Sequence, residues 1–157
     1  MLLNDFIDEA EVSPARLAIE LETAVISYKS EDDATLYVNE DGFFPFWVRI
    51  QHKARFVTFS SYLALRDSAS DIDRLQLANG FNRTAFFLTA YVSDDLLKFD
   101  HVLNFRDGLT RQTFVRGCRN FANAIETGIS KFDPDYKILM SLKDMASDAS
   151  RGDGSSC

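Results

Sequence analysis

The residues of this sequence that could carry chemistry are few and lie far apart. A metal site needs several His, Cys or carboxylate ligands at workable spacing, and only His52 and His101 occur. His101 shares strand parity with apolar neighbours such as Phe99 and Leu103. We therefore predict that His101 is a hydrogen-bonded residue of the core rather than a ligand. His52 falls in a predicted turn and is expected to be solvated.

The cysteines and acidic pairs give no catalytic arrangement. Cys118 lies on the apolar stripe of a predicted helix, where a buried and inert thiol is expected, and Cys157 is the last residue. A nucleophile would also need a base in reach, and neither a Gly-rich phosphate loop nor a Gly-x-Ser-x-Gly motif occurs. Asp32-Asp33 and Asp94-Asp95 fall in predicted turns. We expect no enzyme activity, no metal and no cofactor.

Composition and charge disfavour some classes of binding partner and indicate the cellular compartment. The chain has 157 residues and a formal net charge of −7, which disfavours nucleic acid and anionic membrane surfaces as partners. Two cysteines do not make a disulfide framework and suit a reducing compartment. The start of the sequence lacks the basic and apolar regions of a signal peptide. A cytoplasmic protein is therefore expected.

Helical periodicity and capping residues predict five helices, the first and the last outside the central part of the chain. Gly80 is expected to end the third helix, at Asn79-Gly80, because glycine is the usual residue just past a helix end. The predicted helices lie at 2–10 and 133–146, or begin at Ser13-Pro14, Ser70 and Thr110. Residues 147–157 are small and polar and are predicted to be disordered.

Alternating apolar residues predict about five strands, of which the last two form a hairpin. The candidates are Thr35–Val38, Phe44–Ile50, Val57–Leu65, Phe86–Val92 and Leu97–Phe105. Short connections favour antiparallel neighbours. The expected fold class is thus α+β, with a single antiparallel sheet flanked by helices in one domain over residues 1–146.

The order of these elements, with Asn79-Gly80-Phe81-Asn82 after a helix and Gly108-Leu109-Thr110 before a long one, resembles the YbjN family. That family is described as "putative bacterial sensory transduction regulator", and the resemblance covers about residues 13–132. It implies the fold of type III secretion chaperones, which are homodimers that hold extended segments of client proteins. It implies no catalytic residues.

Aromatic residues off the predicted core face suggest an interface. Phe43 and Trp47 alternate with the core residues of their strand, and Phe87 and Tyr91 do so in another. Exposed apolar patches on a globular protein usually mark an interaction surface. We expect these four residues to serve self-association, unless the two terminal helices cover them within the monomer.

Two asparagines, Asn79 and Asn82, allow two interpretations. Capping of a helix end is the simpler one, because Asn bonds readily to nearby backbone. The alternative is the polar lip of a groove that reads a partner's backbone. Together these features favour a non-enzymatic, protein-binding or chaperone-like regulator that acts as a homodimer. A small-ligand binder, or an enzyme with a site not readable from the sequence, is the alternative.

Overall fold

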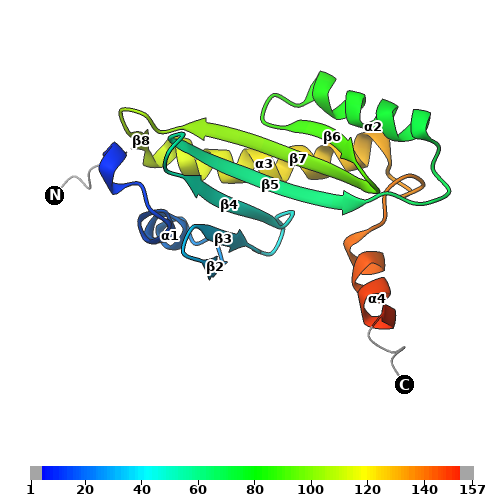
Figure 1. Ribbon diagram of the computed structural model, residues 1–157, viewed down its shortest axis with the longest axis horizontal. Coiled ribbons are helices and arrows are strands. Elements are labelled where there is room, and N and C mark those ends of the chain that lie inside the picture. The colour runs from blue at the N-terminus through cyan, green and yellow to red at the C-terminus, as the bar shows by residue number, and fades with distance from the viewer. Residues whose placement is uncertain (1–4, 153–157) are drawn as a thin grey trace.

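The main sheet has six strands in the order β2-β3-β4-β5-β7-β6, and all neighbouring pairs are antiparallel (Figure 1). The computed structural model describes residues 5–152. The strands are β2 (Tyr28–Asp32), β3 (Thr35–Val38), β4 (Phe46–Gln51), β5 (Phe56–Ala64), β6 (Thr89–Ser93) and β7 (Leu96–Asn104). The predicted α+β class with an antiparallel main sheet is confirmed, but this sheet has six strands rather than about five, and a second sheet of two strands accompanies it.

Four α-helices accompany the sheet: α1 (Pro14–Thr23), α2 (Asp71–Thr84), α3 (Arg111–Phe132) and α4 (Leu142–Gly152). The first three begin at the predicted N-caps, because Ser13, Ser70 and Thr110 each accept a hydrogen bond from a backbone N–H three residues on. A short 3-10 helix (Glu9–Glu11) and the two-stranded pair β1 (Phe6–Ile7) and β8 (Leu109–Thr110) complete the fold.

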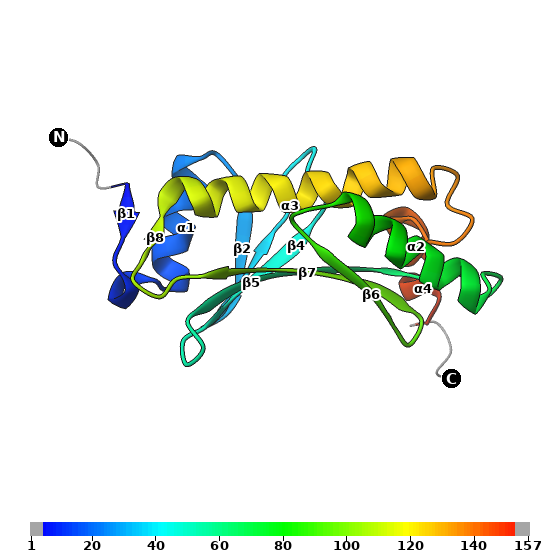
Figure 2. The ribbon, with the colours of Figure 1, turned by 90° about the horizontal axis from the view of Figure 1, so that it is seen from above.

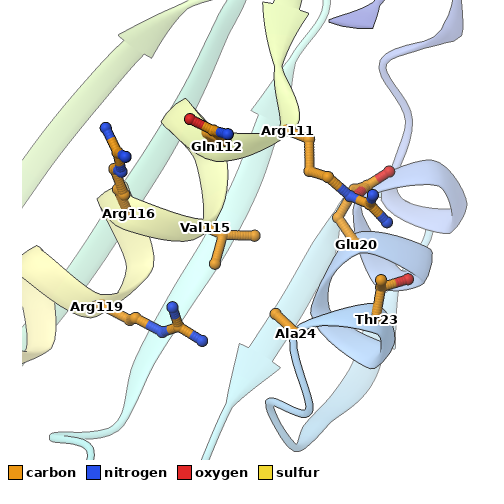
Figure 3. A pocket seen from close by; sticks show the side chains of 8 residues that line it. All are labelled: Glu20, Thr23, Ala24, Arg111, Gln112, Val115, Arg116 and Arg119. Carbon is orange, nitrogen blue, oxygen red and sulfur yellow. The ribbon is translucent and has the colours of Figure 1, made fainter. Parts of the chain in front are cut away.

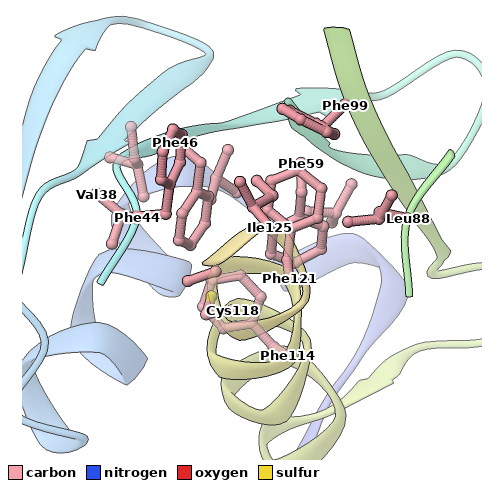
Figure 4. Close-up of a cluster of buried hydrophobic side chains, with 14 of the residues drawn as sticks. Val38, Phe44, Phe46, Phe59, Leu88, Phe99, Phe114, Cys118, Phe121 and Ile125 are labelled. Atoms are coloured by element: carbon pink, nitrogen blue, oxygen red, sulfur yellow. The ribbon is translucent and has the colours of Figure 1, made fainter. Parts of the chain in front are cut away.

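The core lies between one face of the sheet and the helices (Figure 4). Phe46 and Phe59 project from β4 and β5 and meet Phe121 of α3, with ring centroids 5.4 and 5.9 Å away. Cys118 lies on the same helix stripe and is fully buried, as predicted. Phe99 of β7 instead contacts Phe81 of α2, at 5.0 Å between centroids. The core face of the sheet therefore meets α2 as well as α3.

Helices α2 and α3 cross closely at two glycines. A Cβ at Gly128 would lie 2.0 Å from the Phe81 ring, and a Cβ at Gly80 would lie 3.1 Å from the Phe132 ring. Gly80 therefore lies inside α2, which continues to Thr84. The prediction that this helix ends at Asn79-Gly80 is wrong. The glycine serves close packing between helices rather than a left-handed helix end.

The predicted helix at residues 2–10 is wrong where the structure describes it. Phe6–Ile7 is a strand that pairs with Leu109–Thr110, and residues 2–4 lie outside the described residues. Ile7 is fully buried, and the Arg111 N–H donates to the Asp5 carbonyl oxygen at 2.8 Å. Contacts distant in sequence therefore override a short helical pattern.

The predicted helix from Asp133-Pro134 is also wrong. The Asp133 carboxylate is 3% exposed and accepts hydrogen bonds from the backbone N–H groups of Lys137, Ile138 and Leu139. These bonds fold the segment into a loop whose Leu139 pairs with Leu65 at the end of β5. Helix α4 starts only at Leu142 and extends to Gly152. The predicted disordered tail is thus helical over residues 147–152, and residues 153–157 lie outside the described residues.

Two strand predictions differ from the structure. Strand β6 begins at Thr89, not at Phe86, and the Phe86 side chain is 92% exposed rather than part of the core face. Strand β2 was not predicted, because four of its five side chains are exposed and polar and give no alternating pattern. It is an edge strand, which needs no buried face of its own.

Candidate functional site

The sheet has one open face. Helices α1, α2 and α3 lie on one side of the sheet, and no helix covers the middle of the other side within residues 5–152 (Figure 2). Alternation along the strands places every second side chain on this side. Tyr62 and Tyr91 are each 40% exposed there, and Val102 is 46% exposed. We call this surface the open face.

None of the helices in the described part of the chain has the length and apolar composition needed to cross a bilayer.

Three aromatic rings from neighbouring strands stand side by side on the open face. Trp47 of β4 stacks on Tyr62 of β5, with ring centroids 5.6 Å apart and planes 3° from parallel. Tyr37 of β3 flanks Trp47 from the other side at 5.0 Å. The indole N–H of Trp47 donates to a Glu31 carboxylate oxygen at 3.0 Å, which fixes the ring. Burial, with smaller effects of Glu31 and Tyr62, raises the pKa of Tyr37 above its ordinary value.

The row continues across β7 to β6. Lys98 lies opposite both Tyr62 and Tyr91 in the strand register. A hydrogen bond to the Asp100 carboxylate, together with partial burial, raises the pKa of the Tyr91 phenol, which therefore stays protonated at neutral pH. The open face is thus a strip of aromatic rings interrupted by one lysine.

The charges of the open face balance. Register and alternation place six charged residues on it or at its β2 edge, three of each sign: Lys29, Arg49 and Lys98, with Glu31, Asp32 and Asp100. The whole chain carries −7. A twofold contact between identical copies requires a self-complementary surface, and a strip with equal numbers of both charges carries no net repulsion against such a contact.

The structure brings only part of the predicted interface together. Trp47 and Tyr91 lie on the open face, whereas Phe43 precedes β4 and is partly buried against the core. Phe87 precedes β6, and its ring packs edge-on against His101 at 6.2 Å, on the helix side of the sheet. Its predicted strand parity does not apply, because β6 starts at Thr89, three residues after the predicted start, and Phe87 lies outside the strand. Tyr37 and Tyr62 were missed, although their alternation with Leu36, Val38 and Leu63 could have identified them.

The two asparagines of α2 have different surroundings. The Asn82 carboxamide accepts from the Ala90 N–H at 2.7 Å and donates to the Ala90 carbonyl oxygen at 2.8 Å. It thereby pairs with strand β6 as another strand would and ties α2 to the sheet edge. Asn79 is exposed on the same helix. A contact of Asn79 with a partner's backbone stays a prediction.

The remaining titratable candidates lie in or beside the core. His101 is half-buried beside the Phe59 ring, and burial lowers its pKa. Burial raises the pKa of the Cys118 thiol above its ordinary range, so the thiolate is strongly disfavoured. Within residues 5–152, no three His, Cys, Asp or Glu residues are placed to share a metal ion.

The described residues thus form an antiparallel sheet with helices on one side and, on the other, an aromatic strip that no helix of residues 5–152 covers. The model of the YbjN family, "putative bacterial sensory transduction regulator", matches residues 13–134. The chain belongs to this family, as the sequence resemblance predicted.

One solved structure supports the same fold. The crystal structure of YbjN, described as "a putative transcription regulator from E. coli", superposes with a TM-score of 0.65 at 20% sequence identity. The superposition covers 81% of this chain and 95% of that chain. At this identity the likeness shows the fold alone. No curated protein sequence matches the chain.

Proposed function

We propose that this protein is a non-enzymatic regulator that binds another protein in a chaperone-like manner and acts as a homodimer in the cytoplasm. The observation that carries the proposal is the open face, with its row of Tyr37, Trp47, Tyr62 and Tyr91. Stacked aromatic side chains supply large apolar area in fixed positions, which is typical of protein interfaces. Membership of a family of regulators, together with the chaperone-like fold that the sequence resemblance implies, supports this proposal.

The second copy of the chain is the occupant that the open face fits best. The strip is electrically neutral on a chain of net charge −7, so two copies that meet there avoid the repulsion expected between two acidic surfaces. Lys98 and Asp100 lie two residues apart on β7, so this part of the strip offers a second copy one charge of each sign. The dimer then forms the unit that binds the partner protein.

The proposal is tested by affinity capture from a source-cell lysate, followed by identification of the bound proteins. Tyr62→Arg introduces a charge into the middle of the strip, at a side chain that is already 40% exposed. Ile72→Arg is the matched control, because Ile72 is 67% exposed on α2, away from the open face. Wild-type protein and Ile72→Arg should retain the same partner, and Tyr62→Arg should lose it. Identical capture by all three proteins would contradict the proposal.

A further inference from the structure

A basic cleft opens between α1 and α3, on the helix side of the molecule and away from the open face (Figure 3). Its volume is about 310 Å³, at the lower end of the range for small-molecule sites. It is lined by Glu20, Thr23, Ala24, Arg111, Gln112, Val115, Arg116 and Arg119. Three arginines against one glutamate leave a local charge of +2 on a chain whose net charge is −7.

The glutamate is already neutralised. Glu20 is 2% exposed, and its two carboxylate oxygens form ion pairs with Arg16 and Arg111. A buried carboxylate held by two guanidinium groups is internally satisfied and does not repel an anion as a free carboxylate would. The same pairing fixes Arg111, whose Nη1 also lies 3.9 Å from the carboxylate of Asp5, an exposed residue. Its guanidinium has five N–H groups, more than these two contacts use.

The other two arginines have no such partner. Neither Arg116 nor Arg119 forms an ion pair with any residue in the part of the chain that the structure describes. In Figure 3 the Arg119 side chain extends toward the gap between the two helices, and Arg116 lies at its outer rim. The Arg119 guanidinium is exposed and points across the cleft toward the end of α1, near Ala24 and Thr23 (Figure 3).

The floor between these charges is apolar. Val115 projects from α3 between Arg111 and Arg119, and Ala24 faces it from the end of α1 (Figure 3). A ligand here would place an anionic group between the guanidinium groups and a small apolar body on Val115 and Ala24. Guanidinium forks match the oxygens of a phosphate group in geometry and charge.

From this arrangement we propose that the cleft binds a small phosphate monoester. Arg111 and Arg119 hold its phosphate group, Arg116 adds charge at the rim, and Val115 and Ala24 contact its organic part. The Gln112 side chain at the mouth of the cleft provides a further donor. The site is independent of dimerisation, because the open face lies on the other side of the sheet.

The test is calorimetric titration of the full chain at fixed ionic strength with two probes, phenyl phosphate and inorganic phosphate. Phenyl phosphate should bind saturably and at least about tenfold more tightly than inorganic phosphate, since only it reaches the apolar floor. Arg119→Gln should weaken phenyl phosphate binding about tenfold or more. Arg83→Gln, which removes an exposed arginine of α2, should leave binding unchanged.

Three results would overturn the proposal. They are no saturable binding of phenyl phosphate, equal affinity for the two probes, and equal weakening by Arg119→Gln and Arg83→Gln. Circular dichroism and the unfolding midpoint of both variants, which alter exposed side chains only, establish that the fold is retained. Sedimentation of the same samples separates this result from the question of dimerisation.

Discussion

The indole ring of Trp47 lies parallel to the phenol ring of Tyr62, with planes 3° apart and centroids separated by 5.6 Å. The strand register pairs Trp47 with Ser60, so Tyr62 is its diagonal neighbour, within reach of aromatic side chains. Because Tyr37 flanks the indole from the other side, three strands contribute to one ordered apolar strip. This strip, on the side of the sheet whose middle no helix of residues 5–152 covers, is the basis of the proposed self-association.

Neighbouring side chains of β7 lie on opposite faces of the sheet, so replacing them by alanine should change the free energy of unfolding by unequal amounts. Phe99 is fully buried against Phe81, so Phe99→Ala should lower the free energy of unfolding by about 3–5 kcal/mol through lost transfer energy and a cavity. Lys98 lies on the open face, and Lys98→Ala should lower it by no more than about 0.5 kcal/mol. Urea denaturation of both variants at one low protein concentration measures the difference. Equal losses would mean that the register of the hairpin is wrong.

The amide pairing of Asn82 with strand β6 predicts a structural role for one asparagine only. Asn82→Ala leaves the N–H and carbonyl groups of Ala90 without their partner and should lower the free energy of unfolding by about 1–3 kcal/mol. Asn79→Ala, on an exposed side of the same helix, should be nearly neutral and serves as the control. Urea denaturation compares the two. If Asn79→Ala lowered the free energy of unfolding more than Asn82→Ala, the assignment of the stabilising contact to Asn82 would be wrong.

Half-burial of His101 predicts a pH dependence of stability. Because burial lowers the pKa of His101 in the folded state, the unfolded chain binds its proton first as pH falls below about 6.5. The contribution of neutral, buried His101 to stability is therefore present above about pH 6.5 and is lost as the pH falls below this value. Unfolding free energy should drop between pH 7.5 and pH 5.5, and the drop should be smaller in His101→Leu. His52→Gln, in an exposed turn, is the control and should show the same change of unfolding free energy with pH as the wild-type protein. If His101→Leu also showed the wild-type change, groups other than His101 would cause the pH dependence.

Complete burial of Cys118 predicts an unreactive thiol. In a Cys157→Ser background, the native protein should react with a thiol reagent far more slowly than the urea-unfolded chain, because burial raises the pKa and blocks access. Cys118→Ala should lower the free energy of unfolding by about 1–2 kcal/mol through lost packing. Reaction at a similar rate in native and unfolded protein would show that Cys118 is accessible.

Much of the fold follows from local patterns in the sequence. The caps Ser13, Ser70 and Thr110 fix three helix starts, because each hydroxyl satisfies a backbone N–H within the same turn. Alternation in β4, β5 and β7 identifies the core face, because one side of these strands is buried. The family resemblance, seen in the sequence over about residues 13–132, rests on the same central elements, and the family model matches residues 13–134.

The errors arise where contacts distant in sequence decide the structure. Gly80 reads as a helix end but is a point of contact with Phe132 of α3, and Asp133 reads as a helix start but closes a loop. Residues 6–7 form a strand only because β8 lies beside them. For the open face, Trp47 and Tyr91 were identified from parity. Phe87 was misplaced because the start of a strand is not visible in an apolar run such as Ala85–Leu88.

The most direct test of the account is the mass of the protein in solution, measured by sedimentation at micromolar concentration. We predict a particle of twice the chain mass of 17.8 kDa for the wild-type protein and for Ile72→Arg, and a monomer for Tyr62→Arg at the same concentration. A wild-type monomer throughout the concentration range would contradict the proposed homodimer. A dimer that persists in Tyr62→Arg would show that the open face is not its interface.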